Sequence, residues 1–437
     1  MNPRSKLQSW LASAPMAGFS LYTATVAFLL YTCVYGFRKT FSIATFDGLV
    51  YAGISFKVWL VTAQVAGYAV SKFIGIKVVS EMKAGSRVQR ILQLVLIAWL
   101  SWLLFAVVPR PYNIVFLFLN GLPLGMIWGL IFSYLEGRRT TDLLGAGLSV
   151  SFIFSAGFTK TVGASVMSLL GTTETWMPFV SSCLFFVPLL GLLWLLDAVP
   201  PPDQLDRENR TERHPMNSSD RKQFIITFAP GLALLIIAYL FLTSFRDFRD
   251  NFTGEIWAGL GYRGSPQIFT TTEVPITVFV LVVMGSLIWV RNNRRALFIN
   301  HLIILSGFLI IGGSTLLFQQ QWISPTAWMI CTGLGLYLAY VPFNSIFFDR
   351  LLAAFKYAGT VGFVMYLADS IGYLGSVGVL FYKEFGQKTA SWLNFYQDVA
   401  LAVSVVGFIL MLGSLLYFER KLHAHQLDQR PATDAAL

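Results

Sequence analysis

Long apolar segments recur along the chain and leave little sequence for anything else. Six of them occupy the first half, at residues 16–46, 56–76, 91–108, 112–135, 144–170 and 176–199. Six more occupy the second half, at residues 224–252, 268–290, 297–318, 322–348, 357–382 and 391–418. A helix of about 20 residues crosses the hydrocarbon core of a bilayer. Because only 12% of the 437 residues are charged, too few for a water-soluble fold, we predict an all-α integral membrane protein with twelve transmembrane helices.

One polar stretch separates the two sets of segments. It contains several prolines and many charged side chains, as a linker does. The first helix of each half also carries a Phe-Arg pair at a similar depth, Phe37-Arg38 and Phe245-Arg246, which suggests an internal repeat and two pseudo-symmetric six-helix bundles. The predicted units are an N-terminal bundle at 1–198, a cytoplasmic linker at 199–223, a C-terminal bundle at 224–418 and a short cytoplasmic tail at 419–437.

Basic residues are concentrated in alternate loops between the apolar segments. Lys and Arg resist translocation, so the loops that carry them are expected on the cytoplasmic side. This pattern predicts a multi-pass protein of the cell membrane (the inner membrane if bacterial) with both termini cytoplasmic. The net charge of +10 therefore reflects topology, and no nucleic-acid partner is expected because no basic patch lies on a soluble module. The three cysteines do not have the spacing of metal ligands, so we expect no metal. We also expect no cofactor, and we expect the protein to be a monomer.

Several charged residues fall inside the predicted membrane spans. A Lys or Arg at the centre of a spanning helix costs about 2.5 to 3.5 kcal/mol, so such residues face a partner or a cavity. The cations are Arg38, Lys39, Lys160, Arg246 and Arg249, and the acids are Asp247, Asp250, Glu273 and Asp369.

Two interpretations of these charges remain open. Arg246 and Asp250 are four residues apart on one helical face, and Asp247 is close in sequence, so part of this cluster could neutralise itself. Arg38 has no acid within reach on its own helix. If the repeat brings Arg38 and Arg246 face to face, an anionic ligand is the simplest completion, because a guanidinium fork matches phosphate or carboxylate oxygens.

The acids and the buried amide have alternatives of their own. Glu273 and Asp369 are either proton carriers or salt-bridge partners of the arginines. Asn344, inside the tenth helix, needs a hydrogen-bond partner, which substrate, water or a neighbouring helix could supply.

Three stretches resemble the major facilitator superfamily, and within it the organophosphate:phosphate antiporters, which exchange glycerol-3-phosphate and hexose phosphates. The segment YGFRKTF, from Tyr35 to Phe41, is similar to the first-helix pattern Tyr-x-x-Arg-Lys-x-Phe of that family, in which the Arg binds phosphate. The segment SKFI, which contains Lys72, matches the end of the second helix, and Arg246 stands where a second phosphate-binding Arg occurs. The fifth helix departs from the pattern, because it lacks the histidine of those exchangers. Lys160 lies about a turn further along, and it either takes that role or has a different one.

The resemblance implies a secondary active transporter for a small organic anion, expected to be phosphorylated, that works by alternating access. Exchange for phosphate and proton coupling both remain open, and a transporter-like membrane sensor of an anionic metabolite is the alternative. We expect no enzymatic activity, since no catalytic arrangement stands out. The expected substrate ligands are Arg38, Arg246, Lys160, Tyr35, Arg249 and Asn344. The residues expected in gating or coupling are Lys39, Lys72, Asp250, Glu273 and Asp369.

Overall fold

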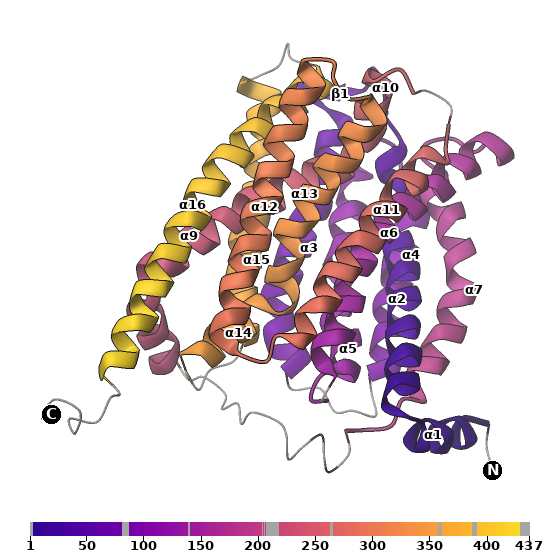
Figure 1. The fold of residues 1–437 in the computed structure, drawn as a ribbon. Helices are drawn as coiled ribbons and strands as arrows, with labels where there is room; N and C mark the ends of the chain where they lie inside the picture. Colours follow the sequence, from indigo (N-terminus) through magenta and orange to yellow (C-terminus); the bar gives the residue numbers. More distant parts are fainter. Residues whose placement is uncertain are drawn as a thin grey trace, which may run out of the picture.

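Helices that run side by side make up almost the whole molecule (Figure 1). The structure is a computed structural model that describes residues 3–80, 87–138, 140–202, 204, 206, 218–262, 265–355, 357, 361–386 and 391–428. Helix α1 and the C-terminal end of α16 lie at one end of the bundle, and β1 and α10 lie at the other end (Figure 1). The two ends of the chain thus approach the same end of the bundle, as an even number of crossings requires.

Twelve long helices form the bundle. Six come from the first half of the chain: α2 (Met16–Lys39), α3 (Phe56–Ser80), α4 (Arg87–Val107), α5 (Ile114–Leu135), α6 (Thr141–Leu170) and α7 (Met177–Asp197). Six come from the second half: α9 (Ser218–Asn251), α11 (Ile268–Ser286), α12 (Asn293–Gln319), α13 (Pro325–Ser345), α15 (Val361–Gly386) and α16 (Trp392–Asp428). The short elements are α1 (Pro3–Ser13), η1 (Thr40–Ile43), β1 (Val50–Tyr51), β2 (Ile54–Ser55), α10 (Thr253–Gly259), η3 (Leu287–Trp289) and α14 (Phe347–Ala354).

Ten of the long helices are apolar enough to cross a membrane by length and composition alone. The other two, α3 and α15, have 25 and 26 residues, and a helix of that length extends about 37 Å. They are more polar because both carry buried charged or hydroxyl side chains, such as Lys72 on α3 and Asp369 on α15. The fold is therefore the predicted all-α membrane fold with twelve helices.

Several predicted boundaries are displaced. The first helix was expected to continue to residue 46, but α2 ends at Lys39 and passes into η1, so Arg38 and Lys39 occupy its last turn. A cation is favourable there because the unsatisfied carbonyl groups of a helix C-terminus carry partial negative charge. Helix α9 already begins inside the predicted linker, and α16 continues into the predicted tail. The linker residues 203, 205 and 207–217 and the tail residues 429–437 lie outside the described residues.

The starts of α12 and α13 follow from local sequence. Ser324 accepts a hydrogen bond from the backbone N–H of Ala327 at 3.2 Å, and Pro325 occupies the first turn of α13. Asn292 accepts one from the N–H of Arg295 at 3.0 Å at the start of α12. Such side-chain caps satisfy N–H groups that a helix start leaves without partners.

Glycines allow α3 and α5 to touch through their backbones. A Cβ atom on Gly67 would lie 2.2 Å from the carbonyl oxygen of Phe118, and one on Gly121 would lie 2.2 Å from that of Gln64. Small residues permit this approach in membrane proteins, where close packing replaces the hydrophobic effect between helices. The pair fixes α3 against α5 within the N-terminal bundle.

Two pairs of helices make the most extensive contacts between the N-terminal bundle and the C-terminal bundle. Helix α6 packs against α11, where a Cβ atom on Gly157 would lie 2.1 Å from the carbonyl oxygen of Phe269. Helix α3 packs against α15, and the rings of Tyr68 and Tyr373 meet edge to face with centroids 5.0 Å apart. The buried charges lie between these two contacts.

The α3–α5 contact predicts that Gly121→Ala lowers stability by about 1–3 kcal/mol, because the added methyl group meets backbone that must shift. Gly191→Ala on α7 is the matched control, since a Cβ atom there meets nothing within 4 Å. Thermal unfolding of the purified variants in detergent measures both. Equal unfolding temperatures for the two variants would show that α3 and α5 do not pack in this way.

Candidate functional site

The end of α2 is held by polar side chains from three neighbouring helices. The carbonyl oxygen of Phe37 accepts hydrogen bonds from Trp102 Nε1 at 2.6 Å and from Asn120 Nδ2 at 3.1 Å. The carbonyl oxygen of Arg38 accepts one from Gln64 Nε2 at 2.9 Å, and Gln64 also donates to Asn120 Oδ1 at 2.9 Å. The sequence analysis missed this clamp, although Gln64 and Asn120 are polar residues inside apolar segments.

Arg38 is a buried cation without an acidic partner among the described residues. Its side chain is 5% exposed, and its guanidinium carbon lies 3.7 Å from the centre of the Tyr68 ring. Nε and Nη2 of Arg38 are buried and have no hydrogen-bond partner in the described part of the chain. A buried donor without a partner costs about 1–3 kcal/mol, and more when it is charged. Arg38 is therefore the group in this region that most needs an anion.

Lys39 and Lys160 share one carboxylate across the interface between the bundles. Asp250 on α9 lies 3.2 Å from Lys39 Nζ and 2.5 Å from Lys160 Nζ. The hydroxyl of Tyr35 donates to Asp250 at 3.2 Å, and Lys39 donates to Asn251 Oδ1 at 2.7 Å. The proposed pairing of Arg246 with Asp250 along one helix face is therefore wrong, because the lysines of the other bundle take this carboxylate.

Arg246 pairs with its neighbour Asp247 instead. Nη2 of Arg246 lies 2.7 Å from Asp247 Oδ1, and Nη1 donates to the hydroxyl of Tyr340. The other oxygen of Asp247 accepts a hydrogen bond from Ser376 on α15 at 2.9 Å. Arg246 is thus neutralised by a protein acid, unlike Arg38.

Arg38 and Arg246 nevertheless share surroundings. Asp247 and Tyr35 lie within electrostatic reach of both guanidinium groups, and so does Tyr373. The two arginines come from the ends of α2 and α9, the first helix of each bundle. Their common neighbours show that the two arginines lie in one polar region.

Arg249 points to a different part of the C-terminal bundle. It lies 2.7 Å from Glu273 on α11, and its Nη2 donates to the carbonyl oxygen of Met329 at 3.3 Å. A Cβ atom on Gly333 would lie 2.7 Å from Arg249 Nη2, so α13 closes over this ion pair. Glu273 is therefore a salt-bridge partner of an arginine, one of its two expected roles, and Arg246 is the arginine that shares neighbours with Arg38.

A second ionic link joins the bundles near the end where the chain termini lie. Lys72 on α3 lies 3.1 Å from Asp369 on α15, and the hydroxyl of Tyr239 donates to Asp369 at 2.5 Å. Tyr239 also contacts the hydroxyl of Tyr340 at 3.1 Å and receives a hydrogen bond from Asn344 at 3.3 Å. The partner of Asp369 is a lysine, not an arginine, and a chain of hydroxyl groups connects this link to Arg246.

A third link closes the opposite end of the interface and was not foreseen. Lys57 on α3 forms an ion pair with Glu255 on α10 and donates to the carbonyl oxygen of Ser42 at 2.8 Å. The backbone N–H of Ser55 donates to Glu384 on α15 at 3.3 Å. Burial raises the pKa of the Glu255 carboxyl, and the Lys57 ammonium opposes that rise. In the sequence, Glu255 lies between two predicted helices, where an acidic residue gives no indication that it is buried.

The central charge cluster consists of six cations and four carboxylates. They are Arg38, Lys39, Lys72, Lys160, Arg246, Arg249, Asp247, Asp250, Glu273 and Asp369. Two positive charges therefore have no carboxylate of their own among these residues. One belongs to Arg38, and the other arises because Lys39 and Lys160 share Asp250.

Solved structures with the same arrangement of helices are transporters. A D-xylose–proton symporter aligns with 90% of this chain and 97% of its own, at a TM-score of 0.62 and 14% identity. A member of the proton-dependent oligopeptide transporters aligns over 92% and 100%, at a TM-score of 0.60 and 15% identity. The nucleoside transporter NupG aligns over 91% and 99%, at a TM-score of 0.58 and 15% identity. The chain therefore has the fold of these solved transporter structures.

The family itself is defined by sequence. The chain belongs to a family of unknown function, DUF5690, which matches residues 40–421. No curated protein matches the chain. The fold and the family together define a membrane protein of transporter architecture, and the substrate must be argued from the central charge cluster.

The shared carboxylate generates a stability prediction. Asp250→Asn leaves two buried ammonium groups without a carboxylate and is expected to destabilise the protein by about 3–5 kcal/mol. Lys160→Met is expected to lower stability less, because Asp250 still forms its ion pair with Lys39 and keeps its other contacts. Thermal unfolding in detergent at low salt compares the two. Equal or greater loss in Lys160→Met would show that Asp250 does not serve both lysines.

Proposed function

We propose that this protein is a secondary active transporter that binds a small organic anion in the central charge cluster and moves it by alternating access. The observation that carries the proposal is Arg38, a buried guanidinium with two unsatisfied donors and no acidic partner among the described residues. A phosphate or carboxylate group accepts from such a fork through short charge-assisted bonds. The similar solved structures are also named as transporters of small molecules, namely a D-xylose–proton symporter and a nucleoside transporter.

The charge balance suggests the kind of anion. Two positive charges of the central charge cluster lack a carboxylate, and a ligand with two negative charges would neutralise them. A phosphate monoester carries about that charge at neutral pH. This agrees with the resemblance to the organophosphate antiporters, which rests on residues 35–41, on the SKFI segment with Lys72 and on the position of Arg246.

Alternating access requires contacts between the bundles that can separate and form again. Asp250 with its two lysines, and Lys72 with Asp369, are such contacts, since each joins a helix of one bundle to a helix of the other. An anion bound to Arg38 and Lys39 would compete with Asp250 for the same ammonium group. Binding would thereby weaken one link between the bundles.

The orientation in the membrane follows from the basic loops. We place α1 and the end of α16 on the cytoplasmic side of the cell membrane, with the bundles at 1–198 and 224–418 joined by the linker at 199–223. The Lys57–Glu255 ion pair then lies at the outer side, and Lys72–Asp369 lies nearer the cytoplasm.

Replacing Arg38 tests the anion site. Arg38→Lys keeps the positive charge but loses the planar fork of donors. It is expected to weaken binding of a phosphorylated sugar or carboxylate by about 10–100-fold, because one or two charge-assisted hydrogen bonds are lost. Ligand-induced thermal stabilisation measures the change. Arg90→Gln is the control, because Arg90 is exposed and donates to the neighbouring side chain of Gln93. Unchanged anion binding in Arg38→Lys would refute the site.

The coupling mode is a separate prediction. Each described carboxylate of the central charge cluster forms an ion pair with a cation, so a proton could bind there only if that ion pair broke. We therefore expect exchange: proteoliposomes should take up labelled anion only when they contain an internal counter-anion. Uptake driven by external acid into empty vesicles, and lost in Asp369→Asn, would instead identify proton symport through Asp369.

A further inference from the structure

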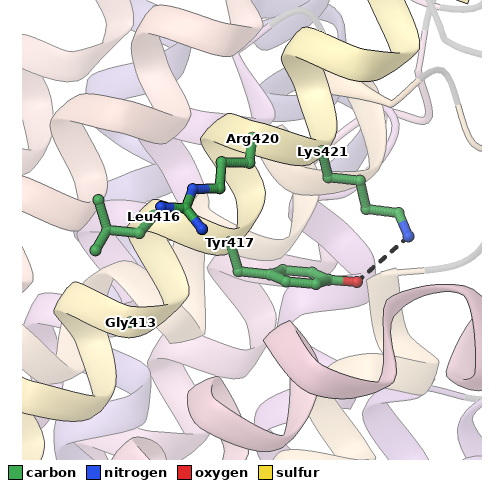
Figure 2. A pocket seen from close by; sticks show the side chains of 5 residues that line it. All are labelled: Gly413, Leu416, Tyr417, Arg420 and Lys421. Carbon is green, nitrogen blue, oxygen red and sulfur yellow. Dashed lines mark hydrogen bonds between the residues drawn. The ribbon is translucent and has the colours of Figure 1, made fainter.

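A pocket of about 480 Å³ lies on the outside of α16, far along that helix from its start at Trp392. Five residues of α16 line it: Gly413, Leu416, Tyr417, Arg420 and Lys421 (Figure 2). This end of α16 is the end shared with α1 (Figure 1). The pocket therefore lies in the half of the molecule that faces the cytoplasmic leaflet if the basic loops are cytoplasmic.

Lys421 is held in place at one side of this pocket. Its ammonium group donates to the carbonyl oxygen of Thr227 on α9 and, at 3.3 Å, to the hydroxyl of Tyr417 (Figure 2). It also lies 5.2 Å from the centre of the Phe228 ring. An ammonium group has three donors, and the described residues use two of them. The remaining donor is available to a ligand.

Arg420 supplies the second cation. Its side chain extends over the helix toward Leu416 (Figure 2). The neighbouring acid, Glu419, is already engaged by Arg294 from α12, with 2.8 Å between Nη2 and Oε2. No described carboxylate pairs with Arg420 or Lys421, so the pocket carries two positive charges.

An exposed apolar stripe continues from the pocket toward the middle of the membrane. Leu416, Leu412, Ile409 and Val405 are all exposed, and their spacing of three or four residues places them on one helix face. Leu412, Leu416 and Arg420 follow one another at intervals of four, so the guanidinium stands at the cytoplasmic end of the stripe. A basic pocket continuous with an apolar stripe matches a molecule with an anionic head and a hydrocarbon tail.

We propose that this pocket binds an anionic phospholipid of the cytoplasmic leaflet, with its phosphate on the Arg420 guanidinium and an acyl chain along residues 405–416. The Lys421 ammonium adds positive charge from the other side of the pocket (Figure 2). The site is separate from the central charge cluster and does not depend on the transported substrate. A free phosphate ion would use the two cations but not the stripe.

Native mass spectrometry with defined lipids tests the proposal. The delipidated protein is titrated with phosphatidylglycerol, with zwitterionic phosphatidylethanolamine of the same acyl chains, and with inorganic phosphate alone. We expect a preferred first binding event for phosphatidylglycerol and none for inorganic phosphate. In Arg420→Gln and Lys421→Gln its affinity should fall about fivefold each, the effect of one basic residue near a lipid headgroup.

Arg295→Gln is the matched control, because Arg295 is an exposed cation at the start of α12, beside the Arg294 that contacts Glu419. It should leave lipid affinity unchanged. Lys421→Met and Arg420→Met keep an apolar side chain of similar length, so they test whether a loss of affinity comes from lost charge or from lost packing. They should bind the lipid as weakly as the Gln variants do. Equal affinity for the two lipids, equal affinity across all variants, or saturation by inorganic phosphate would each overturn the proposal.

Discussion

Charge compensation inside an apolar bundle governs the centre of this molecule. A cation enclosed by helices must meet a carboxylate, an aromatic ring or a ligand, since the surroundings cannot solvate it. Lys39, Lys160 and Arg246 meet carboxylates, whereas Arg38 meets only the face of Tyr68 among the described residues. The hydrogen bond from Gln64 to the carbonyl oxygen of Arg38 holds the end of α2 and thereby keeps this cation in place.

The same ion pairs join the two bundles. Asp250 reaches across the interface to two lysines, and Asp369 reaches across it to Lys72. Buried pairs add little net stability, because desolvation offsets most of the attraction, but breaking one is costly. Links of this kind would suit the alternating access that we propose, since a competing ion can replace one partner. Structural and functional roles of these charges are thus two aspects of one network.

Sequence alone predicted the fold because long apolar segments and basic loops are global signals. It also identified charges that the structure buries, since a charged residue inside an apolar segment stands out. It could not predict who pairs with whom: Arg246 with Asp247 instead of Asp250, or Asp369 with Lys72, depends on how helices from different bundles meet. Gln64 and Glu255 escaped notice because their roles come entirely from tertiary contacts.

A structure of the protein with a bound phosphorylated sugar or dicarboxylate tests the central claim most directly. The account predicts ligand oxygens about 2.7–3.1 Å from Nε and Nη2 of Arg38, the two donors that the described residues leave unused. An anion bound elsewhere, with Arg38 still lying only against Tyr68, would contradict it.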